Sequence, residues 1–124
     1  MVIFDTCAII EACKKVPDFS AKVVKQMEAG FYLLSISFAE IACKIKLGKL
    51  EMGIPTKILY QQYRQIEKAE IVDISVEHWL DSIDLSWDNK DPADRIITAF
   101  AAKSDLPIVT TDQRIKQFYK KVIW

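Results

Sequence analysis

Four acidic residues lie at positions in this sequence where carboxylates could together bind a metal ion. Asp5 and Asp112 come directly after short apolar runs, and Glu40 follows a third run. Asp94 opens a helix-like stretch that leads into the last of these runs. Four carboxylates at one place would repel one another by several kcal/mol in total, at an effective dielectric constant of ~20, unless a cation lay among them. A shared cation would remove this repulsion.

The residues around these acids favour a hard cation. Carboxylate ligands without nearby His or Cys suit Mg²⁺ or Mn²⁺ better than zinc or copper. The single histidine, His78, lies in a helical pattern and is expected on or near a helix surface. Cys7, Cys13 and Cys43 show no C-x-x-C spacing and lie in apolar stretches, which predicts reduced thiols in the core of a cytosolic protein.

Each acid also has a structural alternative as a helix cap. Asp91 precedes Pro92 and lies three residues before Asp94, which fits an N-cap, a proline at the first helical position and an acid that reaches back to the cap. Ser37 with Glu40 fits a capping box, and Asp5 and Asp112 fit N-caps or turns. Capping and metal binding are compatible, because a helix N-terminus favours the ionised carboxylate.

Alternating strand and helix patterns predict how these acids are positioned. Short apolar runs predict strands at residues 2–4, 31–37, 70–74, 106–111 and 121–124. Helical patterns lie at residues 20–30, 37–50, 55–69, 76–85 and 92–103. Apolar strands separated by helices indicate a three-layer α/β/α domain with a central parallel sheet of four to five strands. The carboxyl ends of parallel strands share one edge, so we expect the four acids to meet there.

Composition limits the domain count and the partners. The chain has 124 residues, of which 51% are hydrophobic and 27% charged, and no linker interrupts it, so residues 1–124 should form one domain. Its 17 basic and 17 acidic residues balance, so attraction for a polyanion must come from local patches. No apolar stretch reaches the length of a membrane span, and the first residues do not form a signal peptide. We therefore expect a soluble cytoplasmic protein without a membrane partner.

The sequence resembles a PIN domain, and most closely the small VapC-type toxin ribonucleases of prokaryotic toxin–antitoxin pairs. The resemblance covers essentially the whole chain in the right order. It is carried by the stretches FDTCAII, SISFAEIACKIKLGKL, DPADRIITAFAAKSDLPIVTTD and the closing VIW.

This resemblance implies a metal-dependent endoribonuclease that hydrolyses RNA phosphodiester bonds. It implies one or two Mg²⁺ or Mn²⁺ ions surrounded by the acids Asp5, Glu40, Asp94 and Asp112. Thr6 and Thr110 lie at positions whose hydroxyl groups orient the acids. Asp91 is assigned mainly to the cap, and the alternative is that it supports the metal ion by holding one of the direct ligands in place. The resemblance also implies a homodimer and a VapB-type antitoxin as partner.

Basic residues near the predicted edge are candidates for contact with the RNA backbone. These are Lys44, Lys46, Lys49, Arg95 and Arg114. The alternative for each is an ordinary solvated position on a helix.

The chain differs from related sequences at two positions that bear on substrate contacts. Related sequences commonly have His-Arg where this chain has Asn89-Lys90, and His, Ser or Asn where it has Cys7.

Two other functions stay open. One is a phosphoacceptor receiver domain, which requires paired acids after the first strand, where this chain has only Asp5. The other is a PIN module that binds RNA or protein without cleaving.

Overall fold

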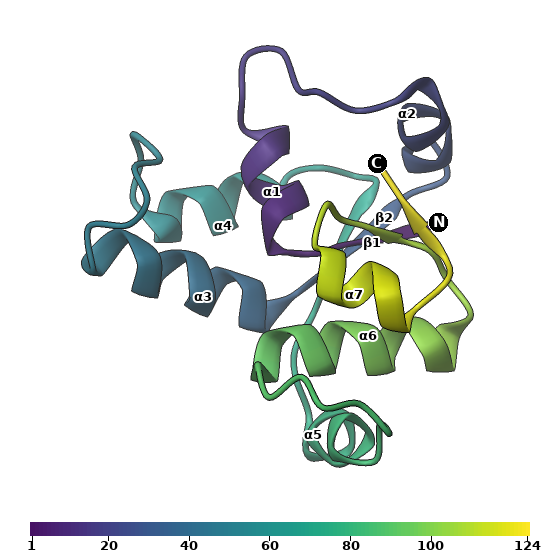
Figure 1. Cartoon of the computed structure of the whole chain (residues 1–124). Helices are drawn as coiled ribbons and strands as arrows, with labels where there is room; N and C mark the ends of the chain where they lie inside the picture. The colour runs from purple at the N-terminus through teal and green to yellow at the C-terminus, as the bar shows by residue number, and fades with distance from the viewer.

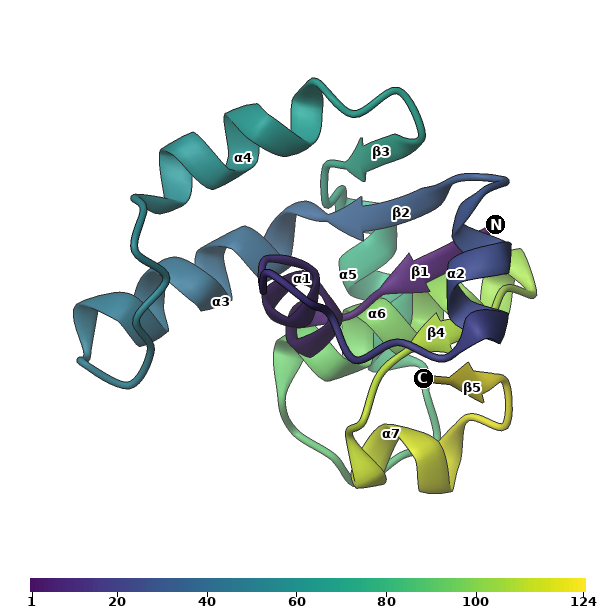
Figure 2. The same ribbon diagram turned by 90° about the horizontal axis from the view of Figure 1, so that it is seen from above.

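A five-stranded parallel sheet forms the centre of the protein. The computed structural model describes all of residues 1–124. Its strands are Val2–Phe4 (β1), Phe31–Leu34 (β2), Ala69–Val72 (β3), Ile108–Val109 (β4) and Val122–Ile123 (β5). They lie side by side in the order β3-β2-β1-β4-β5, and every neighbouring pair is parallel (Figure 2). The predicted three-layer α/β/α fold with a parallel sheet is confirmed.

Seven helices connect the strands and cover both faces of the sheet (Figure 1). They are Thr6–Ala12 (α1), Ala21–Met27 (α2), Ser35–Lys46 (α3), Thr56–Arg64 (α4), Val76–Ile83 (α5), Pro92–Ser104 (α6) and Gln113–Phe118 (α7). Helices α1 to α4 contribute to the core on one face, and α6 and α7 to the core on the other. Helix α5 packs against α6 (Figure 1). None of the seven combines the length and the apolar character that crossing a membrane requires.

The alternation of side chains along the strands divides the core into two clusters. Val2 and Phe4 of β1 pack with the first cluster, whereas Ile3 between them packs with the second. Both faces of β1 are fully buried, because the sheet has helices on each side. The ends of this central strand are therefore held rigidly, and the residue that follows β1 has a fixed position.

Two expectations from the sequence are corrected at β2. The predicted strand 31–37 ends at Leu34, and α3 begins at Ser35, because a short apolar run does not distinguish a strand from a buried helical turn. Ser37 and Glu40 form no capping box. Ser37 is instead the third residue of α3, fully buried, and its hydroxyl accepts a hydrogen bond from Thr6.

The cysteines are free, as predicted, but they are not core residues. Cys13 and Cys43 are exposed and Cys7 is half-buried. The apolar stretches that contain them are amphipathic helices, so a position within such a stretch did not indicate burial.

Candidate functional site

The chain changes direction across the sheet at β1. Strands β2 and β3 lie on one side of β1, and β4 and β5 lie on the other. The segments leaving β1 and β4 therefore diverge at the carboxyl edge, which is where open α/β sheets usually bind ligands. Asp5 directly follows β1, and Thr110 directly follows β4. The candidate site lies at this switch point.

The four predicted acids line one pocket at this edge. The pocket has a volume of about 320 Å³, and its acidic residues are Asp5, Glu40, Asp91, Asp94 and Asp112. Lys44 and Arg114 are its basic residues. The side chains come from four helices or their caps, α1, α3, α6 and α7, so only the folded sheet brings them together. No three of the His, Cys, Asp and Glu side chains are arranged to hold a metal ion directly.

Asp5 is the most buried acid of the pocket. Its Oδ1 accepts hydrogen bonds from the backbone N–H of Ala8, at 3.0 Å, and from the thiol of Cys7, at 2.9 Å, and its Oδ2 accepts one from the hydroxyl of Thr110. The bond to Ala8 confirms Asp5 as the N-cap of α1. Burial raises the pKa of Asp5, and the three hydrogen bonds oppose that rise.

Asp112 caps α7 and leaves one oxygen open. Its Oδ1 accepts hydrogen bonds from the backbone N–H groups of Arg114, at 2.8 Å, and Ile115, at 3.0 Å. Its own N–H donates to the Thr110 hydroxyl at 2.9 Å. Thr110 thus makes a hydrogen bond with both Asp5 and Asp112. The Oδ2 of Asp112 has no hydrogen-bond partner in the protein.

Asp91 and Asp94 have different roles, since only Asp91 caps a helix. Asp91 is the N-cap of α6, with Pro92 next to it, and its side chain accepts from the backbone N–H of Asp94 at 3.0 Å. Asp94 makes no return bond to the cap backbone. Its Oδ2 accepts a hydrogen bond from the side chain of Asn89 at 2.9 Å, and its Oδ1 has no partner in the protein. Asp94 is therefore not needed to cap the helix.

Asp94 also experiences the repulsion expected of a carboxylate cluster. Its pKa is raised to about 6, mainly by burial, and the negative charges of Asp91, Asp112 and Glu40 add smaller contributions to this rise. These charges act on Asp94 from three different elements. Part of the rise in the pKa of Asp94 therefore comes from neighbouring carboxylates.

Glu40 enters the pocket from α3 and is held only through its helix. It is half-buried, and its side chain makes no hydrogen bond or ion pair. The hydroxyl of Thr6 donates to Ser37 at 3.0 Å and so joins α1 to the first turn of α3. Thr6 was expected to orient the acids, and its hydroxyl contacts the helix that carries Glu40.

The basic residues expected to contact RNA lie in different surroundings. Lys44 and Arg114 line the acidic pocket, whereas Lys46 and Lys49 are exposed on α3 and just beyond it, outside the pocket. The guanidinium group of Arg114 donates a hydrogen bond to Oδ1 of Asn89. Only two cationic side chains therefore accompany the five acids of the pocket.

Arg95 has a structural role that the sequence did not indicate. All five of its N–H groups donate to backbone carbonyls at the end of α5 and in the segment between α5 and α6, namely those of Ser82, Ile83, Leu85, Trp87 and Asn89. No donor is left for a phosphate group. The expectation that Arg95 contacts the RNA backbone is corrected on this ground.

Asn89 and Cys7 are site residues whose contacts could not be assigned from the sequence. Asn89 is 2% exposed and contacts both Asp94 and Arg114. The spacing from Asn89 to Asp91 is that of an Asx turn, in which the side chain accepts from the backbone two residues later, here at 2.9 Å. That local signal could have predicted the turn, but not the contact with Arg114, which lies 25 residues away.

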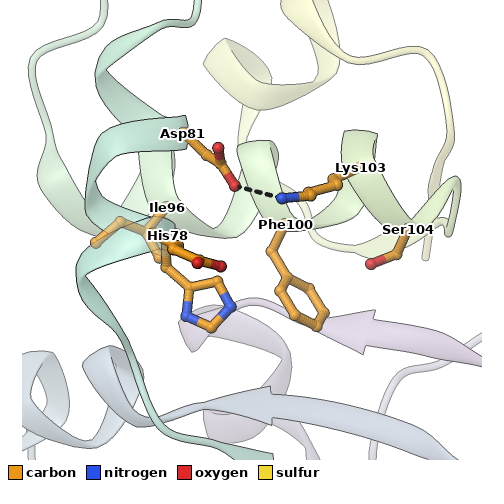
Figure 3. A pocket seen from close by; sticks show the side chains of 7 residues that line it. His78, Asp81, Ile96, Phe100, Lys103 and Ser104 are labelled. Atoms are coloured by element: carbon orange, nitrogen blue, oxygen red, sulfur yellow. Dashed lines mark hydrogen bonds and ion pairs between the residues drawn. The ribbon is translucent and has the colours of Figure 1, made fainter.

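A second, smaller pocket lies between α5 and α6, away from the acids (Figure 3). Its volume is about 110 Å³, and its lining includes His78, Phe100, Asp81 and Lys103. Asp81 and Lys103 form an ion pair at 3.1 Å across its rim (Figure 3). The His78 ring packs against Phe100, and its Nδ1 accepts the backbone N–H of Ser75 in a capping box. His78 is thus a capping residue, half-buried as its sequence context suggested.

The chain belongs to the PIN domain family. The family model matches residues 2–121, which is nearly all of the chain. No match was found among curated protein sequences. The receiver-domain alternative is thereby set aside.

Solved structures with the same fold include several toxin–antitoxin proteins. VapBC2 from Rickettsia felis, bound to a DNA fragment from its promoter, has a TM-score of 0.68 and 16% identity, covering 100% of this chain and 98% of that chain. VapC20 from Mycobacterium tuberculosis, a sarcin-ricin loop cleaving toxin, has a TM-score of 0.66 and 8% identity, covering 94% of both chains. FitAcB from Neisseria gonorrhoeae has a TM-score of 0.63 and 20% identity, covering 100% of this chain and 97% of that chain.

Proposed function

We propose that this protein is a metal-dependent endoribonuclease and the toxin of a VapBC-type pair. The observation that carries the proposal is the convergence of Asp5, Glu40, Asp94 and Asp112 on one pocket at the switch point of a PIN fold. Repulsion from Asp112 and Glu40 contributes to the raised pKa of Asp94, although burial is the larger cause. The VapC20 neighbour is a toxin that cleaves RNA of the sarcin-ricin loop, which is consistent with this activity.

The donor atoms of the pocket fit Mg²⁺ or Mn²⁺. All candidate ligands are carboxylate oxygens, and Asp94 and Asp112 each keep one oxygen without a hydrogen bond, as Glu40 keeps both. Mg²⁺ retains several water ligands in proteins, so it does not require three carboxylates in direct contact. A bound ion would lower the pKa of a coordinated water toward neutrality and stabilise negative charge on the phosphate.

The charged residues of the pocket determine how a cation and an RNA phosphate would bind there. Five acids and two bases give the pocket a negative charge, which would repel an RNA phosphate in the absence of a cation. Lys44 and Arg114 are the side chains of the pocket that could bind phosphate oxygens. Thr110 and Cys7 keep the Asp5 carboxylate in place through its hydrogen bonds.

Cleavage of RNA under controlled metal conditions tests the activity. We expect the purified protein to cleave RNA with Mg²⁺ or Mn²⁺ and to stop in excess EDTA. Asp5→Asn should abolish cleavage with the fold intact, because the amide keeps the shape of the side chain and loses its charge. Asp73→Asn is the matched control, since Asp73 is exposed and lies outside the pocket. Cleavage that persists in EDTA would exclude the metal mechanism, and intact metal binding without cleavage would support the binding-module alternative.

An apolar groove on the opposite face of the sheet from α6 supports the antitoxin part of the proposal. The groove has a volume of about 550 Å³, and ten of its eleven lining residues are hydrophobic. Its walls come from α1, α4 and the segment before α4, including Ala12, Met52, Ile54, Leu59 and Ile66. A helix with an apolar face would bury these side chains. Basic residues on the same partner would complement the acidic pocket.

Thiol labelling can locate this partner on the surface. Cys13 lines the groove, whereas Cys43 is exposed on α3 outside it. We expect the product of the adjacent gene to protect Cys13 from a maleimide reagent and to leave Cys43 reactive. Equal labelling of both cysteines in a stable complex would place the partner elsewhere. The absence of any antitoxin gene next to this one would count against the toxin assignment and leave the nuclease assignment in place.

A homodimer is the second part of the proposed assembly. The outer side of α5 carries Val76, Leu80 and Ile83 at helical spacing, and these side chains are 72%, 57% and 69% exposed. Together with Trp79 they form a continuous apolar stripe. Burying such a stripe against a second copy would remove it from water. We propose this α5 stripe as the dimer contact.

A further inference from the structure

Asn89 joins the acidic and the basic side chains of the pocket through the two ends of one amide group. Its Nδ2 donates to Oδ2 of Asp94 at 2.9 Å. Its Oδ1 accepts from the guanidinium group of Arg114 and from the backbone N–H of Asp91, the latter at 2.9 Å. Asn89 is 2% exposed, so the amide is fixed in place and not exchanging with water.

The neutral amide lies between two groups of opposite charge. Asp94 and Arg114 both contact Asn89, yet they form no ion pair with each other. The three ion pairs of the protein lie elsewhere and involve neither residue. An arginine and a carboxylate that share one hydrogen-bonding partner could otherwise form a charge-assisted, often bidentate pair.

Such a pair would inactivate both side chains for the proposed chemistry. The free oxygen of Asp94 would be turned toward the guanidinium group, and a metal ion would have to displace it. Two of the five N–H donors of Arg114 would be occupied by Asp94 and lost to a phosphate group. Within a partly desolvated pocket this attraction would be stronger than at the surface.

We infer that Asn89 is a positioning residue that keeps Arg114 apart from Asp94, so that the acid can bind a cation while the arginine stays available for RNA phosphate. This inference rests on the proposed metal-dependent function. The amide suits the task because it donates to the acid and accepts from the base at the same time. Alanine can do neither, and aspartate can only accept.

A crystal structure of metal-free Asn89→Ala tests the separation independently of any activity. We expect Arg114 to move onto Asp94 and form an ion pair within the usual N···O distance. A structure in which the two side chains stay apart would overturn the inference. Because no metal or RNA takes part, this result holds even if the protein proves not to be a nuclease.

Calorimetric titration with MnCl₂ tests the consequence for the cation. In Asn89→Ala the Mn²⁺ affinity should fall by about 10- to 100-fold, the usual effect of losing a residue that orients a ligand. Adding Arg114→Gln to that variant should restore the affinity to nearly that of Arg114→Gln alone, because the competing charge is gone. A double variant that stays as weak as Asn89→Ala would show a merely structural role and overturn the inference.

The Asn89→Asp variant separates the two ends of the amide. It keeps the acceptor for Arg114 and Asp91 and loses the donor to Asp94. We expect Arg114 to stay on residue 89, so that Mn²⁺ binding is retained better than in Asn89→Ala. Equal losses in the two variants would overturn the inference. A wild-type protein that binds no Mn²⁺ would refute the proposed function, and the Asn89→Ala structure would then decide the inference alone.

Discussion

The hydroxyl group of Thr110 donates a hydrogen bond to Oδ2 of Asp5, although 105 residues separate the two in the chain. This contact joins the carboxyl ends of β1 and β4, the two strands on either side of the switch point. The same hydroxyl accepts the backbone N–H of Asp112. One side chain therefore fixes two of the four acids.

Thr110→Val should destabilise the protein by about 1 to 3 kcal/mol at neutral pH, because a buried carboxylate oxygen and a backbone N–H lose their partner. Thr110→Ser, which keeps the hydroxyl, is the control. Losing this hydrogen bond would raise the pKa of Asp5 further, since the bond now lowers it. The deficit should then shrink as the pH falls and Asp5 becomes protonated. Urea unfolding at several pH values measures both effects, and a deficit that grows toward low pH would contradict this account.

The metal-free protein should gain stability as the pH falls through about 6. The pKa of Asp94 is raised to about 6 in the folded protein, above the ordinary value of 3.8, so the folded state binds the proton more tightly than the unfolded state. Stability contributed by protonated Asp94 is therefore lost as the pH rises through about 6. Asp94→Asn should remove this slope and melt at the same or a higher temperature than wild type above that pH.

A bound metal ion should make ionised Asp94 favourable to stability, whereas in the metal-free protein its charge is unfavourable. Mn²⁺ should raise the melting temperature of the wild type, because it binds the folded state, and should raise that of Asp94→Asn much less. Thermal melts of both proteins with and without Mn²⁺ give the comparison. A destabilised Asp94→Asn that kept the full metal-induced rise would remove Asp94 from the proposed site.

Substitution of Arg95 should change the stability of the protein, whereas substitution of Arg114 should change the salt dependence of RNA binding. Arg95→Lys keeps the charge but offers three donors in place of five, so it should destabilise the protein by roughly 2 kcal/mol or more. Its RNA affinity should keep the wild-type dependence on salt. Arg114→Gln should reduce the slope of log affinity against log salt by about 1, as expected for one lost phosphate contact. A reduced slope for Arg95→Lys, with an unchanged slope for Arg114→Gln, would reverse these two assignments.

Thr98→Val should stabilise the protein, whereas Thr110→Val should destabilise it. The hydroxyl oxygen of Thr98 is fully buried in α6 and is the one buried side-chain polar atom without a hydrogen bond. Thr98→Val keeps the shape and removes the unsatisfied group, so we expect a gain of about 1 kcal/mol in the free energy of unfolding. Urea titration beside Thr110→Val makes a matched pair. A loss at both positions would mean that the Thr98 hydroxyl has a partner, such as a buried water.

The α5 stripe should control the oligomeric state. We expect light scattering to find a dimer at micromolar concentration and Leu80→Asp to convert it to a monomer, because a charge in the centre of an apolar contact is costly to bury. Val16→Asp is the control, since Val16 is 82% exposed but lies alone. A wild-type monomer, or a dimer that tolerates Leu80→Asp, would place the α5 stripe outside any dimer contact.

The sequence predicted the parts of this site that depend on short-range order. The run before Asp5 and the Asp91-Pro92 pair are local signals, and the structure places β1 and the start of α6 where they indicated. The gathering of the acids followed from parallel strands sharing one edge. What the sequence could not predict depends on contacts between distant segments.

Arg95 and Asn89 illustrate that limit. A basic residue beside an acidic motif is equally consistent with binding phosphate and with holding a loop, and only the positions of the carbonyl groups between α5 and α6 decide the matter. The partner of Asn89 on α7 likewise depends on how α6 and α7 pack. The end of β2 at Leu34 was missed because the alternating Ser35-Ile36-Ser37 that follows the apolar run is also typical of a strand.

The placement of β4 beside β1 has a consequence for how the protein acquires its activity. Because Asp5 emerges early in synthesis and Thr110 and Asp112 emerge late, the pairing of the two strands is a contact of high sequence separation, and such contacts form slowly. A nascent chain that stops before β4 would carry β1 with one unpaired edge and an incomplete set of acids. The proposed nuclease activity would therefore begin only after the chain had closed its sheet.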